Sequence, residues 1–202
     1  MSQTFQQLPL QIDGATKTVT ASTPSSDPAL TTELSSLGTL HRAIQTSHAP
    51  NAIPPPPLPV DPKRSAQITK LRETGNTSFR KQHYAEAIKL YSLAIEMALT
   101  RPQWEPAALV RDEASQLYAN RAQAYMAGQN WPEGSVDAQC SVDLKKVGNA
   151  KAWWRRGRCL LEMGRIEEAR AWVAEGLEFE GQEADLLGLM DEIKQRLAKG
   201  ER

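Results

Sequence analysis

The chain is poor in the residues that mark several classes of protein. Its 202 residues include three histidines and two cysteines, Cys140 and Cys159, and neither cysteine has the Cys-x-x-Cys or Cys/His spacing of a metal site. A disulfide scaffold and a structural zinc site are therefore disfavoured, and free thiols in a reducing compartment are expected. An excess of one charge is lacking too, because 24 Lys and Arg face 24 Asp and Glu. The net charge thus gives no reason to expect a nucleic acid as partner.

Long apolar runs and catalytic motifs are also missing. No stretch reaches the ~18 consecutive apolar residues of a membrane span, and residues 1–10 contain no Lys or Arg and no apolar run. We therefore expect neither membrane insertion nor secretion. Residues 1–62 hold no glycine-rich loop, no cluster of metal ligands and no nucleophile beside a base. The sequence thus predicts a protein without enzymatic activity, cofactor or metal.

Composition divides the chain near residue 62. Ten of the 13 prolines lie in residues 1–62, whereas the aromatic residues other than Phe5 lie beyond it. The proline-rich stretch at residues 49–62 cannot continue a helix, because proline lacks the amide donor and fixes φ. We expect a semi-rigid polyproline spacer there, with a ligand for an SH3-type groove as the alternative.

The region before the spacer, residues 1–48, carries the signs of a hairpin and of one helix. Leu8–Asp13 and Lys17–Ala21 alternate apolar and polar residues around an Asp-Gly pair, which predicts a weak hairpin. Asp27 has the features of an N-cap, with Pro28 at the first helical position. One apolar stripe follows at steps of three and four: Leu30, Leu34, Leu37, Leu40 and Ile44. Because this stripe is too small to be a core alone, we expect it to dock on the second segment or on another chain.

Beyond residue 62, a pattern of small and large residues repeats. The first copy is Gly75, Tyr84, Ala87, Tyr91 and Ala94, and it recurs 82 positions later as Gly157, Ile166, Ala169, Val173 and Gly176. A weaker copy, 47 positions after the first and 35 before the last, is Ala122, Trp131, Gly134, Ala138 and Ser141. Small residues are needed where two antiparallel helices of a pair cross closely, and large ones fill the space between pairs.

At these positions the chain resembles the tetratricopeptide repeat, a unit of about 34 residues built from two helices. The resemblance implies an all-α fold, in which three repeats form a superhelix over residues 63–202. The first spacing exceeds one repeat by the segment Thr100–Asp112, which we expect to lengthen a loop and its flanking helices. A C-terminal capping helix is predicted from the apolar stripe Leu186, Leu187, Met190, Ile193 and Leu197.

Such arrays bind ligands in a concave groove lined by the first helix of each repeat. Arg72 and Asn76 are spaced i, i+4 in the first unit, and Lys151 and Arg155 have the same spacing in the third. Asn120 lies on the corresponding helix of the second unit. Side chains at this spacing share one helix face. We therefore expect three cations and two amides to converge on one groove.

This set resembles the carboxylate clamp of chaperone-binding tetratricopeptide domains, where Lys, Asn, Asn, Lys and Arg hold a partner that ends in Glu-Glu-Val-Asp. The matching residues are, in that order, Arg72, Asn76, Asn120, Lys151 and Arg155, with Arg72 in place of the family's Lys. The resemblance implies that charge-assisted hydrogen bonds hold the partner's terminal carboxylate and its last Asp side chain. By register, Met126, Arg158 and Leu161 are also predicted to lie on the concave surface, where they would receive upstream residues of the peptide.

A narrower resemblance concerns the layout of the whole chain. The stretches Ser92–Ala98 and Arg101–Glu105, the long insert and the capping helix resemble the small cytosolic tetratricopeptide subunit of the fungal post-translational Sec translocation complex. This implies an adaptor that is peripheral on the cytosolic face of the endoplasmic reticulum. A membrane-anchored Sec subunit would hold it there through the N-terminal region. The clamp would dock cytosolic heat-shock chaperones, which bring unfolded precursors to the channel.

Two other functions fit the same residues. A soluble co-chaperone would link chaperones to one another without membrane attachment. A structural scaffold subunit would have its groove filled by its own partner. Membrane recruitment separates the adaptor from the first alternative, and binding of a Glu-Glu-Val-Asp peptide separates it from the second.

Overall fold

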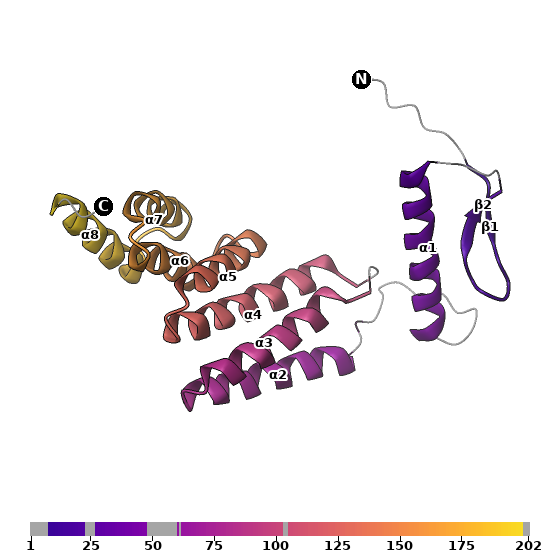
Figure 1. Ribbon diagram of the computed structural model, residues 1–202, viewed down its shortest axis with the longest axis horizontal. Coiled ribbons are helices and arrows are strands. Elements are labelled where there is room, and N and C mark those ends of the chain that lie inside the picture. The colour runs from indigo at the N-terminus through magenta and orange to yellow at the C-terminus, as the bar shows by residue number, and fades with distance from the viewer. Residues whose placement is uncertain (1–7, 23–26, 48–59, 61, 103–104, 200–202) are drawn as a thin grey trace, which may run out of the picture. The chain divides into compact units, whose positions relative to one another are not determined.

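The computed structural model forms two compact units, one of residues 1–59 with 102–105 and one of residues 60–101 with 106–202. The residues that it describes are 8–22, 27–47, 60, 62–102 and 105–199. The spacer predicted at residues 49–62 lies almost wholly outside them. Figure 1 labels the two strands and eight helices of these residues. The predicted all-α fold is confirmed, and one two-stranded hairpin accompanies it.

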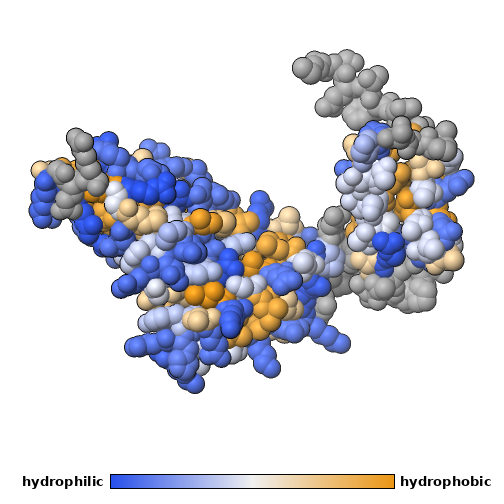
Figure 2. Space-filling view, in the orientation of Figure 1, coloured by the Kyte–Doolittle hydropathy of each residue, from blue (hydrophilic) through white to orange (hydrophobic). Residues whose placement is uncertain are grey.

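The first unit contains the predicted hairpin and the predicted helix. Strands β1 (Leu10–Ile12) and β2 (Val19–Ala21) pair antiparallel, with Gln11 opposite Thr20. Helix α1 (Pro28–Ser47) begins as expected, because a side-chain oxygen of Asp27 accepts a 2.9 Å hydrogen bond from the amide of Ala29. Within this unit, apolar side chains lie between α1 and the hairpin (Figure 2).

The packing of the first unit leaves apolar side chains in solvent. Gly38 of α1 lies against β2, where a Cβ atom would stand 3.4 Å from the backbone nitrogen of Val19. Leu10, Ile12 and Leu37 are nevertheless between 43% and 56% exposed. The unit therefore leaves part of its apolar surface exposed, as the small size of its stripe predicts.

In its described residues, the second unit is a stack of seven helices. They are α2 (Pro62–Arg80), α3 (Tyr84–Leu99), α4 (Ala107–Ala127), α5 (Trp131–Leu144), α6 (Ala150–Glu162), α7 (Ile166–Glu180) and α8 (Ala184–Ala198). Helices α2 and α3, α4 and α5, and α6 and α7 form the three pairs (Figure 1). No helix of the described residues has both the length and the apolar character needed to cross a bilayer.

The turns within the three pairs keep the predicted spacing. Gln82, Gln129 and Gly164 each have φ between 59° and 76°, in the left-handed region. They are separated by 47 and 35 residues, which are the spacings of the repeated pattern. Each helix pair therefore turns at the same position of its repeat, although glutamine fills that position in two of the three.

Small residues stand where the helices of a pair cross, as the alignment predicts. A Cβ atom at Gly75 would lie 2.6 Å from the ring of Tyr91, and one at Gly157 would lie 2.5 Å from Cγ2 of Val173. A Cβ atom at Gly176 would meet the ring of Trp153 at 3.1 Å. These contacts leave no room for a larger side chain, because protein interiors are close-packed.

The insert between the first two pairs lengthens a helix. Helix α4 begins at Ala107, so the second half of the predicted insert is helical. A buried ion pair fixes this region, since Arg101 donates 2.8 Å hydrogen bonds to both carboxylate oxygens of Glu113 and a third to Ser65. The stack ends as predicted, because α8 buries Leu186 and Ile193 against the last pair.

Candidate functional site

The candidate peptide site is arranged around one face of α4. Gln116, Asn120 and Gln123 are spaced i, i+4 and i+7 on this helix, so their side chains project from the same face. Each of the three amides bonds to a residue of a neighbouring first helix, either α2 or α6. Helix α4 therefore joins the clamp residues of the first and third repeats.

The two clamp asparagines are in direct contact. Asn120 donates a 3.3 Å hydrogen bond from Nδ2 to Oδ1 of Asn76. The same oxygen accepts a 2.7 Å hydrogen bond from the hydroxyl of Tyr91. With two donors on its oxygen, the amide of Asn76 is fixed in one orientation, and its NH₂ group is left to donate to a ligand.

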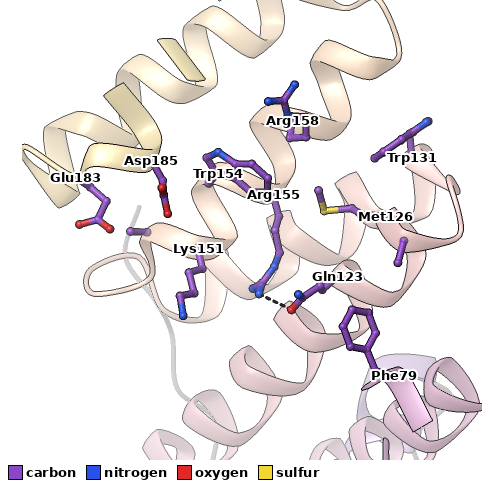
Figure 3. Close-up of a pocket in the computed structure, with 12 residues that line it drawn as sticks. Phe79, Gln123, Met126, Trp131, Lys151, Trp154, Arg155, Arg158, Glu183 and Asp185 are labelled. Atoms are coloured by element: carbon purple, nitrogen blue, oxygen red, sulfur yellow. Dashed lines mark hydrogen bonds between the residues drawn. The ribbon is translucent and has the colours of Figure 1, made fainter. Parts of the chain in front are cut away.

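The two clamp arginines bond to glutamines of α4. Arg155 donates a 2.9 Å hydrogen bond from Nη2 to Oε1 of Gln123, which Figure 3 marks with a dashed line. Arg72 donates in the same way to Oε1 of Gln116. Burial lowers the pKa of the Arg155 guanidinium below its ordinary value, since no carboxylate offsets the loss of solvent. Lys151, one turn before Arg155, is exposed.

Two other arginines of the repeat domain, Arg121 and Arg158, pair with carboxylates. Arg121 forms a bidentate ion pair with Asp137 at 2.7 and 2.8 Å, and Arg158 forms one with Glu192 at 2.7 and 2.9 Å. A carboxylate neutralises each of these cations, whereas an amide oxygen leaves the charge of Arg72 and Arg155 intact. The guanidiniums of Arg72 and Arg155 therefore remain electrostatically open to an acidic ligand.

A pocket of about 630 Å³ lies beside this set, a volume typical of ligand sites. Lys151, Arg155 and Arg158 line it from α6, and Met126 lines it from the end of α4. Its apolar surface comes from Phe79, Met126, Trp131 and Trp154 (Figure 3). The pocket thus adds room for an apolar side chain to a group of cations.

Two of the three residues that were predicted by register line this pocket, and one does not. Met126 and Arg158 are lining residues, although Glu162 and Glu192 already neutralise Arg158. The prediction for Leu161 is wrong, because its side chain is 1% exposed. Leu161 belongs to the buried cluster that includes Ile193 of α8. The capping helix covers this face of α6 and removes it from the concave surface.

Acidic side chains form another part of the pocket lining. Glu183 and Asp185, at the start of α8, line the pocket together with the cations of α6 (Figure 3). Neither carboxylate forms an ion pair with another residue in the described part of the chain. A ligand in this pocket would therefore meet positive charge on one side and negative charge on the other.

Sequence reasoning missed the amides that organise the site. Gln116 and Gln123 carried a usable signal, since they stand four residues before and three after Asn120. The repeat pattern predicts that Trp131 packs between repeats, and its side chain also lines the pocket. Among the described residues, no group of three or more His, Cys, Asp or Glu side chains could hold a metal ion.

Known proteins share both the repeat and the layout of the chain. A family model of the tetratricopeptide repeat matches residues 150–182. The ER protein translocation subcomplex subunit sec67 of Schizosaccharomyces pombe is 39% identical over 138 residues, which are 67% of this chain and 71% of that protein.

Solved structures extend the likeness to the whole fold. A chain in the cryo-EM structure of the Sec complex from S. cerevisiae superposes with a TM-score of 0.71 and 25% identity, covering 96% of this chain and 100% of the other. The first TPR of Spaghetti (RPAP3), bound to the HSP90 peptide SRMEEVD, superposes with a TM-score of 0.55 and 27% identity. That match covers 66% of this chain and 95% of the other.

These similarities differ in how much of the chain they cover. The peptide-bound domain corresponds to about two thirds of the chain, whereas the Sec-complex chain corresponds to nearly all of it. The sequence identity to sec67 spans about two thirds of each protein. The chain therefore belongs to the family of the ER protein translocation subcomplex subunit sec67.

Proposed function

We propose that this protein is a non-enzymatic adaptor that binds the C-terminal Glu-Glu-Val-Asp tail of cytosolic heat-shock chaperones. It docks these chaperones at the endoplasmic-reticulum translocation complex for post-translational import. One observation carries the proposal. Three hydrogen bonds join amide side chains of α4 to cationic and amide side chains of α2 and α6, and no carboxylate of the described residues neutralises Arg72 or Arg155.

The chemistry of the groove matches a free C-terminus. A terminal Asp offers two carboxylates close together, and each can accept several hydrogen bonds. Arg72, Lys151 and Arg155 supply charge-assisted donors, while Asn76 and Asn120 add donors without adding repulsion. The apolar surface of the pocket takes an uncharged side chain upstream of the acidic end. We expect micromolar affinity, on the order of 7 to 8 kcal/mol.

Different relatives support the proposed peptide ligand and the proposed cellular location. The similar TPR of Spaghetti (RPAP3) is bound to an HSP90 peptide that ends in Glu-Glu-Val-Asp. The similar sec67 protein is a subunit of an ER protein translocation subcomplex. Tethering a chaperone beside a translocation channel raises the local concentration of its precursor and needs no chemistry on the precursor.

The N-terminal region, residues 1–48, is the part that we assign to a membrane-anchored Sec subunit. Its exposed Leu10, Ile12 and Leu37 supply apolar surface for such a partner. Residues 49–62 act as the linker to the repeat domain, residues 63–202. Deletion of residues 1–62 should abolish recruitment to microsomes and leave peptide binding intact. Loss of both would show that the N-terminal region belongs to the repeat core.

Calorimetry with the full-length protein tests the peptide site. A peptide that ends in Glu-Glu-Val-Asp should bind as the free acid and not as the C-terminal amide. Replacement of Arg155 by Ala should weaken binding at least tenfold, because a charge-assisted hydrogen bond is lost. Thermal stability should stay nearly unchanged, since the side chain of Arg155 has Gln123 as its one hydrogen-bond partner among the described residues. Equal binding of acid and amide would contradict the proposal and favour a scaffold role.

A further inference from the structure

The two clamp arginines donate to side-chain amide oxygens, whereas Arg121 and Arg158 pair with carboxylates. Gln116 and Gln123 of α4 each place an amide oxygen on a clamp guanidinium, on Arg72 and Arg155 respectively. The two glutamines stand on the face of α4 that carries Asn120. Both are exposed, so neither is required to fill the core. Their position on the groove needs an explanation other than packing.

A side-chain amide can hold an arginine in place before an acidic ligand binds. Its oxygen accepts a hydrogen bond from the guanidinium, which limits the rotamers of a long side chain before the ligand arrives. It carries no formal charge, so the guanidinium keeps its full attraction for a carboxylate. The NH₂ group of the same amide has two donors that can reach the same carboxylate.

The paired Arg158 illustrates the alternative arrangement. This arginine also lines the pocket, but carboxylates of Glu162 and Glu192 hold it at 3.2 and 2.7 Å. An acidic ligand would have to compete with those carboxylates for the cation. At Arg72 and Arg155 the side chain is held in place and the charge is left available.

We infer that Gln116 and Gln123 are positioning residues of the peptide site, which hold the clamp arginines through their amide oxygens and donate to the bound carboxylates through their NH₂ groups. This inference rests on the proposed function, because it assumes an acidic peptide in the groove. It extends the site from five residues to seven. It also means that α4 holds the clamp arginines of the first and third repeats in place for the ligand.

Isosteric variants of Gln123 test the inference in the full-length protein. In Gln123→Glu, the new carboxylate pairs with Arg155 and competes with the peptide, so the Kd of a free-acid Glu-Glu-Val-Asp peptide should rise at least tenfold. In Gln123→Met, the shape is kept but the acceptor and donors are lost, so the Kd should rise about three- to tenfold. Gln195→Glu adds the same charge on an exposed part of α8 and should change the Kd less than about twofold.

The salt dependence of binding separates positioning from a purely structural effect. Neutralising Arg155 should flatten the dependence of Kd on salt in Gln123→Glu, whereas Gln123→Met should keep the wild-type slope. Thermal unfolding should show the same midpoint for all variants within about 2 °C. Wild-type affinity in Gln123→Met, or equal weakening by Gln195→Glu, would overturn the inference. Failure of the wild-type protein to bind the free acid would instead overturn the proposed function.

Discussion

The hydroxyl of Tyr91 on α3 donates a 2.7 Å hydrogen bond to the side-chain oxygen of Asn76 on α2. Tyr91 is one of the large residues of the repeat pattern, and its ring packs on the space left by Gly75. The same side chain therefore closes the first helix pair and orients an amide of the groove. Burial raises the pKa of the Tyr91 hydroxyl above its ordinary value, so it remains a hydrogen-bond donor at neutral pH.

Replacement of Tyr91 by Phe should weaken peptide binding and leave the fold intact. The ring still fills the gap beside Gly75, but Asn76 loses the bond that fixes its orientation. We expect the Kd of the free-acid peptide to rise about three- to tenfold, the value of one hydrogen bond. Tyr118→Phe removes a hydroxyl from α4 away from the pocket lining and should bind as the wild type does. Unchanged affinity in Tyr91→Phe would show that peptide binding does not depend on the hydrogen bond from Tyr91 to Asn76.

Close helix crossing predicts opposite effects for two glycines. In Gly157→Ala, the new Cβ would stand 2.5 Å from Val173 and 2.9 Å from Leu189, so overpacking should lower the free energy of unfolding by about 1–3 kcal/mol. In Gly188→Ala, no atom lies within 4 Å of the new Cβ, so the gain in helix propensity should raise the free energy of unfolding by about 0.5–1 kcal/mol. Urea denaturation followed by circular dichroism measures both. Equal shifts in one direction would contradict the crossing geometry.

The ion pair between α6 and α8 predicts a pH dependence of stability. Hydrogen bonds from Arg158 hold the pKa of Glu192 below its ordinary value of 4.5. A lowered folded-state pKa stabilises the fold above about pH 4.5, and this contribution is lost as the pH falls through the lower value. Glu192→Gln should therefore be less stable than the wild type at pH 7, and the difference should shrink below pH 4.5. Urea midpoints measured from pH 7 to pH 3 test this, and a constant difference would refute it.

The acidic lining of the pocket should oppose an acidic peptide. Replacing Glu183 by Gln and Asp185 by Asn removes two negative charges beside Lys151, so affinity for the free-acid peptide should rise about two- to fivefold at low salt. The gain should vanish near 0.5 M salt, where screening is strong. Glu178→Gln with Asp191→Asn removes the same charge outside the pocket lining. An equal gain in affinity in that control would show that the effect comes from net charge and not from the pocket lining.

Much of the fold could be predicted because the repeat is a local pattern. The small residues at Gly75 and Gly157 were recognisable from their spacing, and each lies at the predicted helix crossing. The hairpin and the start of α1 followed from alternation and from an N-cap at Asp27. In each case the decisive contacts lie within one helix pair or one turn of chain.

The site could be predicted only as far as helical register reaches. Spacing on single helices pointed to Arg72, Asn76, Asn120, Lys151 and Arg155, and their binding role stays a prediction. Register failed for Leu161, because whether a face of α6 is open depends on where α8 packs. Helical register also missed Gln116 and Gln123, because their role depends on the arginines that they contact on neighbouring helices.

The amino-acid sequence by itself determined which residues share a helix face and which positions must be small, because both follow from the 3.6-residue period and from the repeat. The tertiary structure alone decided which cations keep an available charge. Arg155 and Arg158 lie on the same helix, yet one meets the amide of Gln123 and the other the carboxylate of Glu192. That difference depends on how α4 and α8 pack against α6. The register of a single helix shows which residues share a face, but it does not show which helix packs on that face.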